Sequence, residues 1–243
     1  MNDNDFWNSI IATDEDKIKG AYYLRERGLE EHINVLNYLQ SFTKNKNRQI
    51  EYSEIATVLR YDKRIRRCLF KYIGVVEERI RAHLLDFYRS NASSFETTQA
   101  FLNNMKKYSN DVYQSINHLM FKQLITIFKK QPDYFKTEVF PNLTNIVLNL
   151  SALVSLRNQV CHNKFLLNNR EFEVCKYNGY ESSSLSANIK NLYLLSDLDC
   201  REGLEKEINV CATAKTSKYN YQVKWKLPRD VIIKIDYSVS VLK

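Results

Sequence analysis

The segment Leu156 to Asn163 (LRNQVCHN) combines residue types that can do chemistry on a phosphodiester. A histidine such as His162 can take a proton from a hydroxyl or give one to a leaving oxygen near neutral pH. An arginine such as Arg157 can bind a phosphate through two hydrogen bonds and stabilise negative charge in the transition state. The pair predicts cleavage of RNA, whose own 2′-hydroxyl supplies the nucleophile. Such a reaction needs no metal or other cofactor, and it leaves a 2′,3′-cyclic phosphate and a 5′-hydroxyl.

The spacing limits how these side chains can cooperate. Five positions on a helix separate Arg157 and His162 by about 140°, so they can border a cleft between two helices or two subunits but cannot form a tight pair. Asn158 lies four residues before His162 and shares its face. Arg27 and His32 repeat the offset in an acidic context, and we interpret that copy as chance. The structural alternative is a helix end with its arginine in solvent and its histidine beside the last carbonyls.

Composition favours a mostly helical body with an anionic partner. The 243 residues include 36 Lys+Arg and 28 Asp+Glu, a net charge of +8, but only 5 Gly and 3 Pro. The most apolar stretch, residues 146–156, is far shorter than the roughly 20 residues that span a bilayer. Met1 to Trp7 is acidic and polar, unlike a signal peptide, and the five scattered cysteines form no CxxC pair. We therefore expect a cytoplasmic protein with reduced thiols, no metal site and no membrane contact.

Apolar periodicity predicts four helical segments: residues 13–42 with an interruption at Gly28, residues 52–90, residues 115–130, and a helix from an Asn142 N-cap to about residue 163. The second carries the clearest apolar stripe: Leu69, Ile73, Val76, Ile80, Leu84 and Phe87. Its polar face is strongly basic. We expect contacts to the RNA backbone from four basic side chains: Arg64, Arg67, Lys122 and Lys164.

Beyond residue 169 the apolar period changes to two. Residues 219–227 and 231–241 alternate around Pro228, which predicts a β-hairpin. The aromatic side chains of Lys215 to Lys226 (KTSKYNYQVKWK) can stack on bases or pack against the body, and both alternatives remain open. The predicted fold is mainly α. A helical bundle occupies residues 1–169, and residues 170–243 form a small β-containing C-terminal extension.

Several segments together resemble one family. Leu156 to Asn163 resembles the R-N-x-x-x-H motif of HEPN ribonucleases. Leu24 to Leu29 (LRERGL) and Tyr61 to Leu84 (YDKRIRRCLFKYIGVVEERIRAHL) resemble the Abi-like AbiD/AbiF branch of prokaryotic abortive-infection proteins. Asn117 to Leu124 (NHLMFKQL) fits the helix that these proteins place before the motif helix. The resemblance spans residues 13 to 167.

The resemblance implies an all-helical bundle whose homodimer joins two motifs for metal-independent RNA cleavage in phage defence or a toxin–antitoxin system. A cognate antitoxin protein or a regulatory RNA would be a further partner. Arg157 and His162 would be catalytic and Asn158 would orient them, while Glu77 and Arg81 match a supporting polar pair on the facing helix. Such an i,i+4 pair can equally well just stabilise its own helix. The chain departs from many members by having Asn163 where they have a second histidine, and its tail has no counterpart.

The leading hypothesis is therefore a cytoplasmic, homodimeric endoribonuclease. A non-catalytic RNA-binding or regulatory module with the same fold and charge is one alternative. A helical protein-interaction scaffold, in which the motif merely closes a dimer interface, is another. In a dimer, both sets of Arg157 and His162 facing one solvent-filled, basic groove would favour the enzyme, whereas buried and mutually satisfied side chains would favour the scaffold.

Overall fold

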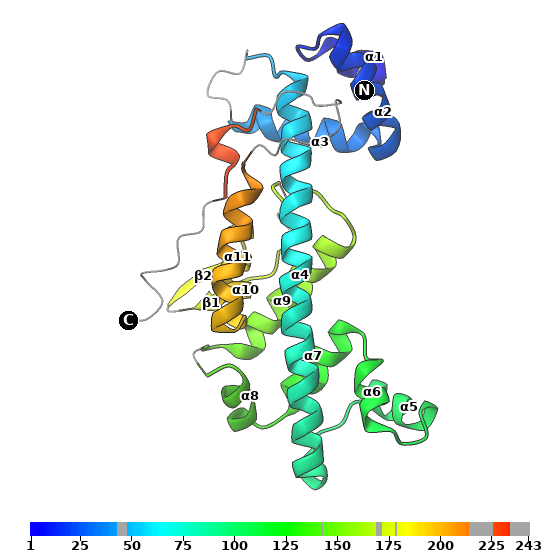
Figure 1. Cartoon of the computed structure of the whole chain (residues 1–243), viewed down its shortest axis with the longest axis vertical. Helices are drawn as coiled ribbons and strands as arrows, with labels where there is room; N and C mark the ends of the chain where they lie inside the picture. Colours follow the sequence, from blue (N-terminus) through cyan, green and yellow to red (C-terminus); the bar gives the residue numbers. More distant parts are fainter. Residues whose placement is uncertain (43–47, 142, 169–171, 178, 214–225, 234–243) are drawn as a thin grey trace. The chain divides into compact units, whose positions relative to one another are not determined.

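The structure is a computed structural model that describes residues 1–42, 48–141, 143–168, 172–177, 179–213 and 226–233. It is mainly helical, with a two-stranded antiparallel sheet as its β structure in these residues (Figure 1). This confirms the predicted mainly-α fold with a small β-containing C-terminal part. No helix within the described residues is long and apolar enough to cross a membrane.

The chain forms two compact units, and each is built from segments that are distant in sequence. Unit 1 comprises Met1–Arg67, Phe165–Asn169 and Glu205–Lys243, and unit 2 comprises Cys68–Lys164 and Arg170–Leu204. The longest helix is α4 (Tyr52–Asn91) (Figure 1). Its residues up to Arg67 belong to unit 1, and those from Cys68 onward belong to unit 2. The units do not coincide with the boundary after residue 169 that the sequence predicts.

Unit 1 begins with three helices that precede α4 in the chain. They are α1 (Asp3–Asn8), α2 (Asp14–Arg27) and α3 (Leu29–Phe42). The Thr13 side chain accepts a hydrogen bond from the Asp16 amide and begins α2 with a capping box. Gly28 ends α2 at a φ of +82°, a conformation that glycine adopts at no steric cost. The predicted interruption at Gly28 is thus confirmed.

Segments from later in the chain pack against α4 within unit 1. The buried Asp62 carboxylate accepts a hydrogen bond from the Leu166 amide at 2.8 Å. The Thr57 hydroxyl accepts one from the Lys226 amide at 3.0 Å, and the Tyr61 hydroxyl accepts one from the Ile233 amide at 2.8 Å. Most of the predicted 219–227/231–241 hairpin, and most of the Lys215–Lys226 stretch, lies outside the described residues. The described segment 226–233 contains the 3₁₀ turn η2 (Arg229–Val231).

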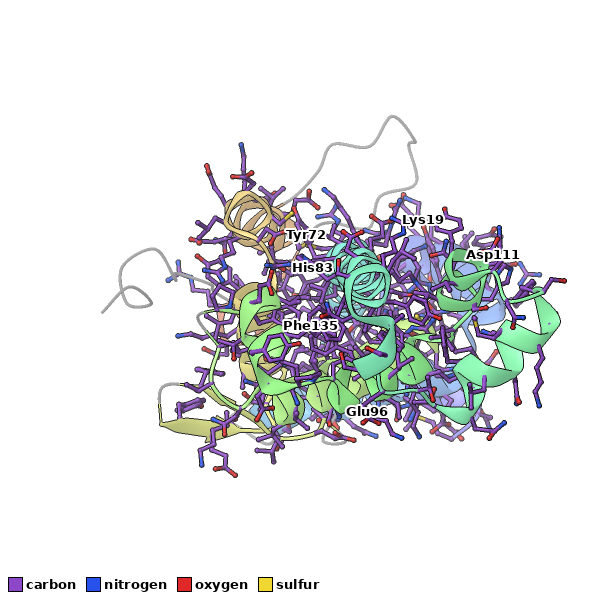
Figure 2. All side chains as sticks on the ribbon, turned by 90° about the horizontal axis from the view of Figure 1, so that it is seen from below. Lys19, Tyr72, His83, Glu96, Asp111 and Phe135 are labelled. Atoms are coloured by element: carbon purple, nitrogen blue, oxygen red, sulfur yellow. The ribbon has the colours of Figure 1, made fainter. Side chains whose placement is uncertain are left out.

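Unit 2 is organised around the second part of α4, whose apolar stripe is buried as predicted. It continues through η1 (Ala92–Ser94), α5 (Gln99–Lys107), α6 (Val112–Asn117), α7 (Phe121–Lys130) and α8 (Asp133–Val139). Phe135 of α8, which is labelled in Figure 2, is buried in this core. Its ring stacks on that of Phe87 of α4, with 4.3 Å between ring centroids. The single helix predicted over 115–130 is wrong, because His118 ends α6 and Met120 begins α7.

The motif-bearing helix α9 (Ile146–Cys161) is held by a buried asparagine. Asn149 accepts a hydrogen bond from the Lys176 amide and donates one to the Lys176 carbonyl, both at 2.8 Å. Asn191 donates to the Asn149 carbonyl at 2.8 Å. These bonds tie α9 to β1 (Cys175–Tyr177) and α10 (Leu185–Leu195). The helix begins at Ile146, after a left-handed Asn145, while the predicted cap Asn142 lies outside the described residues.

The C-terminal part of the chain is more helical than its alternation suggests. β1 pairs with β2 (Tyr180–Ser182) in a short hairpin, with Cys175 opposite Ser182. Two helices follow, α10 and α11 (Leu198–Cys211), which the period-2 interpretation missed. All five cysteines lie within the described residues, and none of them forms a disulfide.

Candidate functional site at the end of α9

The end of α9 is fixed by a Schellman motif that includes the last residue of the sequence motif. The Lys164 amide donates to the Gln159 carbonyl and the Asn163 amide donates to the Val160 carbonyl, both at 3.2 Å. Asn163 has a φ of +54°, the left-handed conformation that asparagine tolerates better than most residues. Asn163 therefore terminates the helix and fixes the place of His162 at its C-cap.

One face of α9 is buried and the other carries the polar motif. Leu153 and Leu156 are fully buried in unit 2. Arg157 is half-buried, whereas Asn158 and His162 are exposed. The helix thus anchors the motif through its leucines while presenting the polar ends to solvent.

In two other histidines of this protein, the side chain contacts a backbone carbonyl of the preceding helical turn. His118 also occupies a helix C-cap, and its Nδ1 lies 2.8 Å from the Gln114 carbonyl four residues earlier. His32 makes the same i−4 contact to the Gly28 carbonyl at 3.0 Å. The His162 side chain makes no hydrogen bond to a backbone carbonyl or to any other group among the described residues. The carbonyl-capping alternative therefore does not describe the placement of this side chain.

The side chains of Arg157 and Asn158 are also available for binding. Within the described part of the chain, neither side chain forms a hydrogen bond or an ion pair. A half-buried guanidinium without a carboxylate partner retains its full capacity for a phosphate, which it can bind through two parallel N–H donors. The three motif residues therefore offer a cation, an amide and an imidazole near the C-terminal end of α9 in unit 2.

Glu77 and Arg81 form the expected ion pair, at 2.6 Å, but the arginine has further partners. Its guanidinium donates to the carbonyls of Ile116 at 2.5 Å and Leu119 at 2.8 Å. These carbonyls lie at the end of α6 and just before α7. Arg81 thus holds the α6–α7 corner against α4, a role that the sequence spacing does not reveal.

The four predicted RNA-contacting residues divide into two groups. Arg64 donates to the carbonyls of Cys211 at 3.3 Å and Thr213 at 2.6 Å, and so closes the end of α11. Arg67, Lys122 and Lys164 are exposed. Arg64 and Arg67 belong to unit 1, whereas the motif, Lys122 and Lys164 belong to unit 2.

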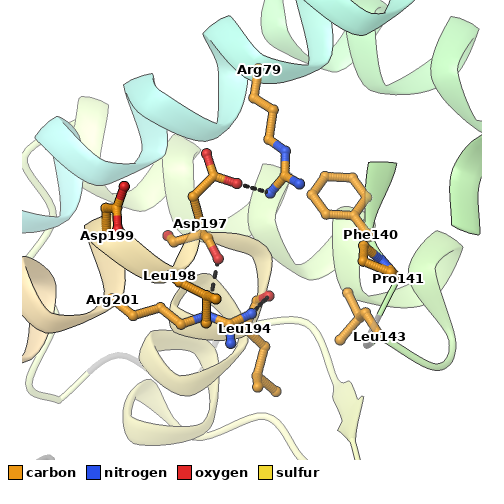
Figure 3. A pocket seen from close by; sticks show the side chains of 10 residues that line it. Arg79, Phe140, Pro141, Leu143, Leu194, Asp197, Leu198, Asp199 and Arg201 are labelled. Atoms are coloured by element: carbon orange, nitrogen blue, oxygen red, sulfur yellow. Dashed lines mark hydrogen bonds and ion pairs between the residues drawn. The ribbon is translucent and has the colours of Figure 1, made fainter. Parts of the chain in front are cut away.

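A separate cavity of about 370 Å³ lies in unit 2, lined by residues of α4, α10 and α11 and by Phe140, Pro141 and Leu143 (Figure 3). Three of its four charged side chains have protein partners among the described residues. Arg79 pairs with Asp197 at 2.5 Å and lies over the Phe140 ring, and Arg201 donates to the Leu194 carbonyl at 2.9 Å. None of the predicted site residues lines this cavity.

The described residues contain no group of three or more His, Cys, Asp or Glu side chains that could hold a metal ion. Comparison with family models, with curated proteins and with solved structures gives no match.

Proposed function

We propose that the chain is a metal-independent endoribonuclease whose chemistry is carried by Arg157 and His162. One observation supports this most directly: three polar motif residues stand at the solvent-facing end of a buried helix, and none of them is committed to another described group. The resemblance to the R-N-x-x-x-H motif of HEPN ribonucleases gives that arrangement its chemical meaning. Phage defence or a toxin–antitoxin system is the setting that the resemblance implies, with an antitoxin protein or a regulatory RNA as the partner that restrains it.

The proposed reaction is an in-line transfer within the RNA. The His162 imidazole removes the proton of a ribose 2′-hydroxyl, and the 2′-oxygen forms a bond to the adjacent phosphorus. The bond from phosphorus to the 5′-oxygen breaks, and that oxygen receives a proton from an imidazolium. The Arg157 guanidinium binds the non-bridging oxygens, whose negative charge grows in the transition state. Asn158, on the same face as His162, orients the two catalytic side chains.

This reaction needs both a base and an acid, whereas each chain offers one motif histidine. Because Arg157 and His162 of one chain point in directions about 140° apart, they do not form a tight pair, and the same two residues of a second chain can complete the site. A homodimer that joins two copies of the α9 end supplies both histidines to one phosphodiester. We therefore propose that the active form is a dimer with a composite site.

A non-catalytic RNA-binding module remains the second candidate. It is favoured by the net charge of +8 and by exposed basic side chains such as Arg67 and Lys122. Such a module requires positive charge but no specific imidazole. It therefore predicts RNA binding that depends on salt and is insensitive to loss of His162.

A single-turnover cleavage assay in EDTA separates the two candidates. We expect the wild-type protein to cleave RNA and His162→Ala to be slower by about 100-fold to 10,000-fold, the usual contribution of a general acid or base. His118→Ala is the matched control, because His118 is also exposed at a helix C-cap. Equal rates for His162→Ala and the wild type would remove His162 from the mechanism, and binding without cleavage would favour the module.

A further inference from the structure

The larger cavity of unit 2, shown in Figure 3, combines charged and apolar walls. Its volume of about 370 Å³ lies within the range of small-molecule sites, which begins at about 300 Å³. Two arginines and two aspartates line it, so the formal charges of its side chains sum to zero. A wall with this balance suits a ligand that is neutral overall better than an ion of one sign.

The Arg79–Asp197 ion pair presents a positive and a negative group side by side. Arg79 Nη1 lies 2.5 Å from Asp197 Oδ1. Within the described part of the chain, the Nη2 and Nε atoms of Arg79 and the second carboxylate oxygen of Asp197 have no hydrogen-bond or ion-pair partner. The two side chains are 21% and 49% exposed, and neither Arg79 nitrogen is among the unpartnered atoms that are fully buried. The pair therefore keeps donors and an acceptor that a ligand can reach.

A second carboxylate adds an acceptor to the same cavity. Asp199 lies in the first turn of α11, and its exposed side chain forms no hydrogen bond or ion pair with a described residue. An acidic side chain in a first turn also stabilises its own helix, so the position alone does not indicate a ligand. It gains meaning because Asp199 lines the cavity together with the unpartnered nitrogens of Arg79.

Apolar side chains form other parts of the wall. Leu143 and Leu194 line the cavity, and each is 8% exposed. The Arg79 guanidinium lies over the Phe140 ring, 5.2 Å from its centroid (Figure 3). This contact restricts the orientation of the guanidinium. The two leucines offer an apolar surface beside the charged groups.

From this combination we propose that the cavity binds a free α-amino acid with an apolar side chain. Such a molecule is a zwitterion at neutral pH and carries its ammonium and carboxylate groups on one carbon atom, so its two charges lie close together like those of the ion pair. The carboxylate accepts hydrogen bonds from Arg79 Nη2 and Nε, whose planar arrangement suits two oxygens. The ammonium donates to Asp197 and Asp199, and the side chain packs against Leu143 and Leu194.

The proposed site is independent of RNA cleavage, because Arg157, Asn158 and His162 do not line this cavity. It also distinguishes a free amino acid from a peptide, whose terminal ammonium and carboxylate groups belong to different residues. A simple amine or carboxylic acid can satisfy only one half of the ion pair.

Calorimetric titration of the full chain at pH 7.5 tests the proposal, with L-leucine, L-phenylalanine and glycine as probes. Each of the first two is compared with the amine and the carboxylic acid that share its side chain. We expect saturable binding of one L-leucine or L-phenylalanine per chain, and binding of glycine and of both analogues at least tenfold weaker. No saturable binding of either amino acid would overturn the proposal. An analogue that binds as tightly as its amino acid would overturn the recognition of a zwitterion.

Two variants assign the binding to this cavity. Asp199→Asn should weaken binding about tenfold or more, the effect of losing one hydrogen bond to a charged group. Arg79→Lys keeps a positive charge for Asp197 but lacks the planar pair of donors, so it should weaken binding by a similar factor. Glu202→Gln, a substitution of an exposed residue of α11 that does not line the cavity, should bind within about twofold of the wild type.

Asp199→Asn should unfold in urea as the wild type does, because the exposed side chain has no described partner to lose. Equal binding by Asp199→Asn and Glu202→Gln would place the ligand elsewhere and contradict the proposal.

Discussion

At the scale of single residues, the motif side chains differ from other histidines and arginines of the chain in having no hydrogen-bond or ion-pair partner among the described residues. His162, His118 and His32 all lie at or near helix ends, but among these three only the side chains of His118 and His32 contact a carbonyl four residues earlier. Among the arginines, Arg64 and Arg81 are bound to backbone carbonyls, whereas Arg157 has no described partner. Sequence spacing alone cannot show this difference, because it depends on which groups the fold brings within hydrogen-bond distance.

The buried carboxylate Asp62 gives unit 1 a distinct pH dependence. Burial raises its pKa from 3.8 to about 6, although the Arg66 charge and backbone amides act in the opposite direction. The folded state therefore binds more protons than the unfolded state between about pH 4 and pH 6. As a result, the unfolding free energy should fall as the pH rises through this window, by at most roughly 3 kcal/mol.

Urea unfolding at pH 4.5 and pH 7 measures this effect. Asp62→Asn cannot titrate, so its unfolding free energy should lack that decrease, and the difference between variant and wild type should change with pH. A constant difference across the window would show that the pKa of Asp62 is not raised in the fold.

Two of the predicted RNA-contacting residues, Arg67 and Arg64, should respond differently to substitution. Arg67→Gln should leave stability unchanged and reduce the slope of log affinity against log salt by about 0.7 to 1, the effect of losing one phosphate contact. Arg64→Gln should instead cost about 1 kcal/mol of stability, because it frees the carbonyls of Cys211 and Thr213. RNA binding at several salt concentrations, together with urea unfolding, tests both. An unchanged salt slope for Arg67→Gln would exclude that residue from the RNA interface.

At the scale of elements, two helical glycines in unit 2 give a paired test of packing. A Cβ added at Gly74 of α4 meets no atom within 4 Å, whereas one added at Gly203 of α11 lies 2.6 Å from the buried Tyr72 hydroxyl. Both alanines gain the same helix propensity. Gly74→Ala should therefore raise the unfolding free energy by about 1 kcal/mol, and Gly203→Ala should lower it by roughly 1–3 kcal/mol. Equal effects in urea unfolding would contradict this packing of α11 on α4.

Local sequence signals predicted the elements that depend on local rules. The glycine that ends α2 and the long apolar stripe of α4 are both confirmed. The break between α6 and α7 escaped prediction because it depends on a histidine C-cap and on Arg81 from another helix. The helices α10 and α11 were missed because alternation in neighbouring segments was extended over them. The role of Asn149, which ties α9 to β1, depends on contacts with a segment distant in sequence and so has no local signal.

The candidate site was also predictable only in the features that depend on local sequence. The motif and its position at a helix end follow from the sequence, and the structure places Arg157, Asn158 and His162 there. Their lack of partners, and the structural engagement of Arg64 and Arg81, follow only from three-dimensional contacts. The C-terminal helix cap at Asn163 had a local signal, an asparagine after the last helical turn, that sequence reasoning interpreted as a departure from a family pattern.

At the scale of the whole molecule, the proposed chemistry requires two copies. Sedimentation equilibrium should show a particle of twice the 28.8 kDa chain mass at the concentrations used for cleavage. Upon dilution below the dimer dissociation constant, the cleavage rate per chain should fall, because each monomer carries one motif histidine. A monomer with undiminished activity per chain would contradict the composite site while leaving a single-chain site open.

The chemistry of the RNA ends tests the central claim most directly. We predict that the wild-type protein and His118→Ala, incubated with RNA in EDTA, generate fragments with 2′,3′-cyclic phosphates and 5′-hydroxyls, and that His162→Ala generates none above background. Mass spectrometry of the fragments distinguishes these ends. Fragments with 3′-hydroxyls and 5′-phosphates, or the same cyclic ends from His162→Ala, would contradict the assignment of this imidazole to RNA cleavage.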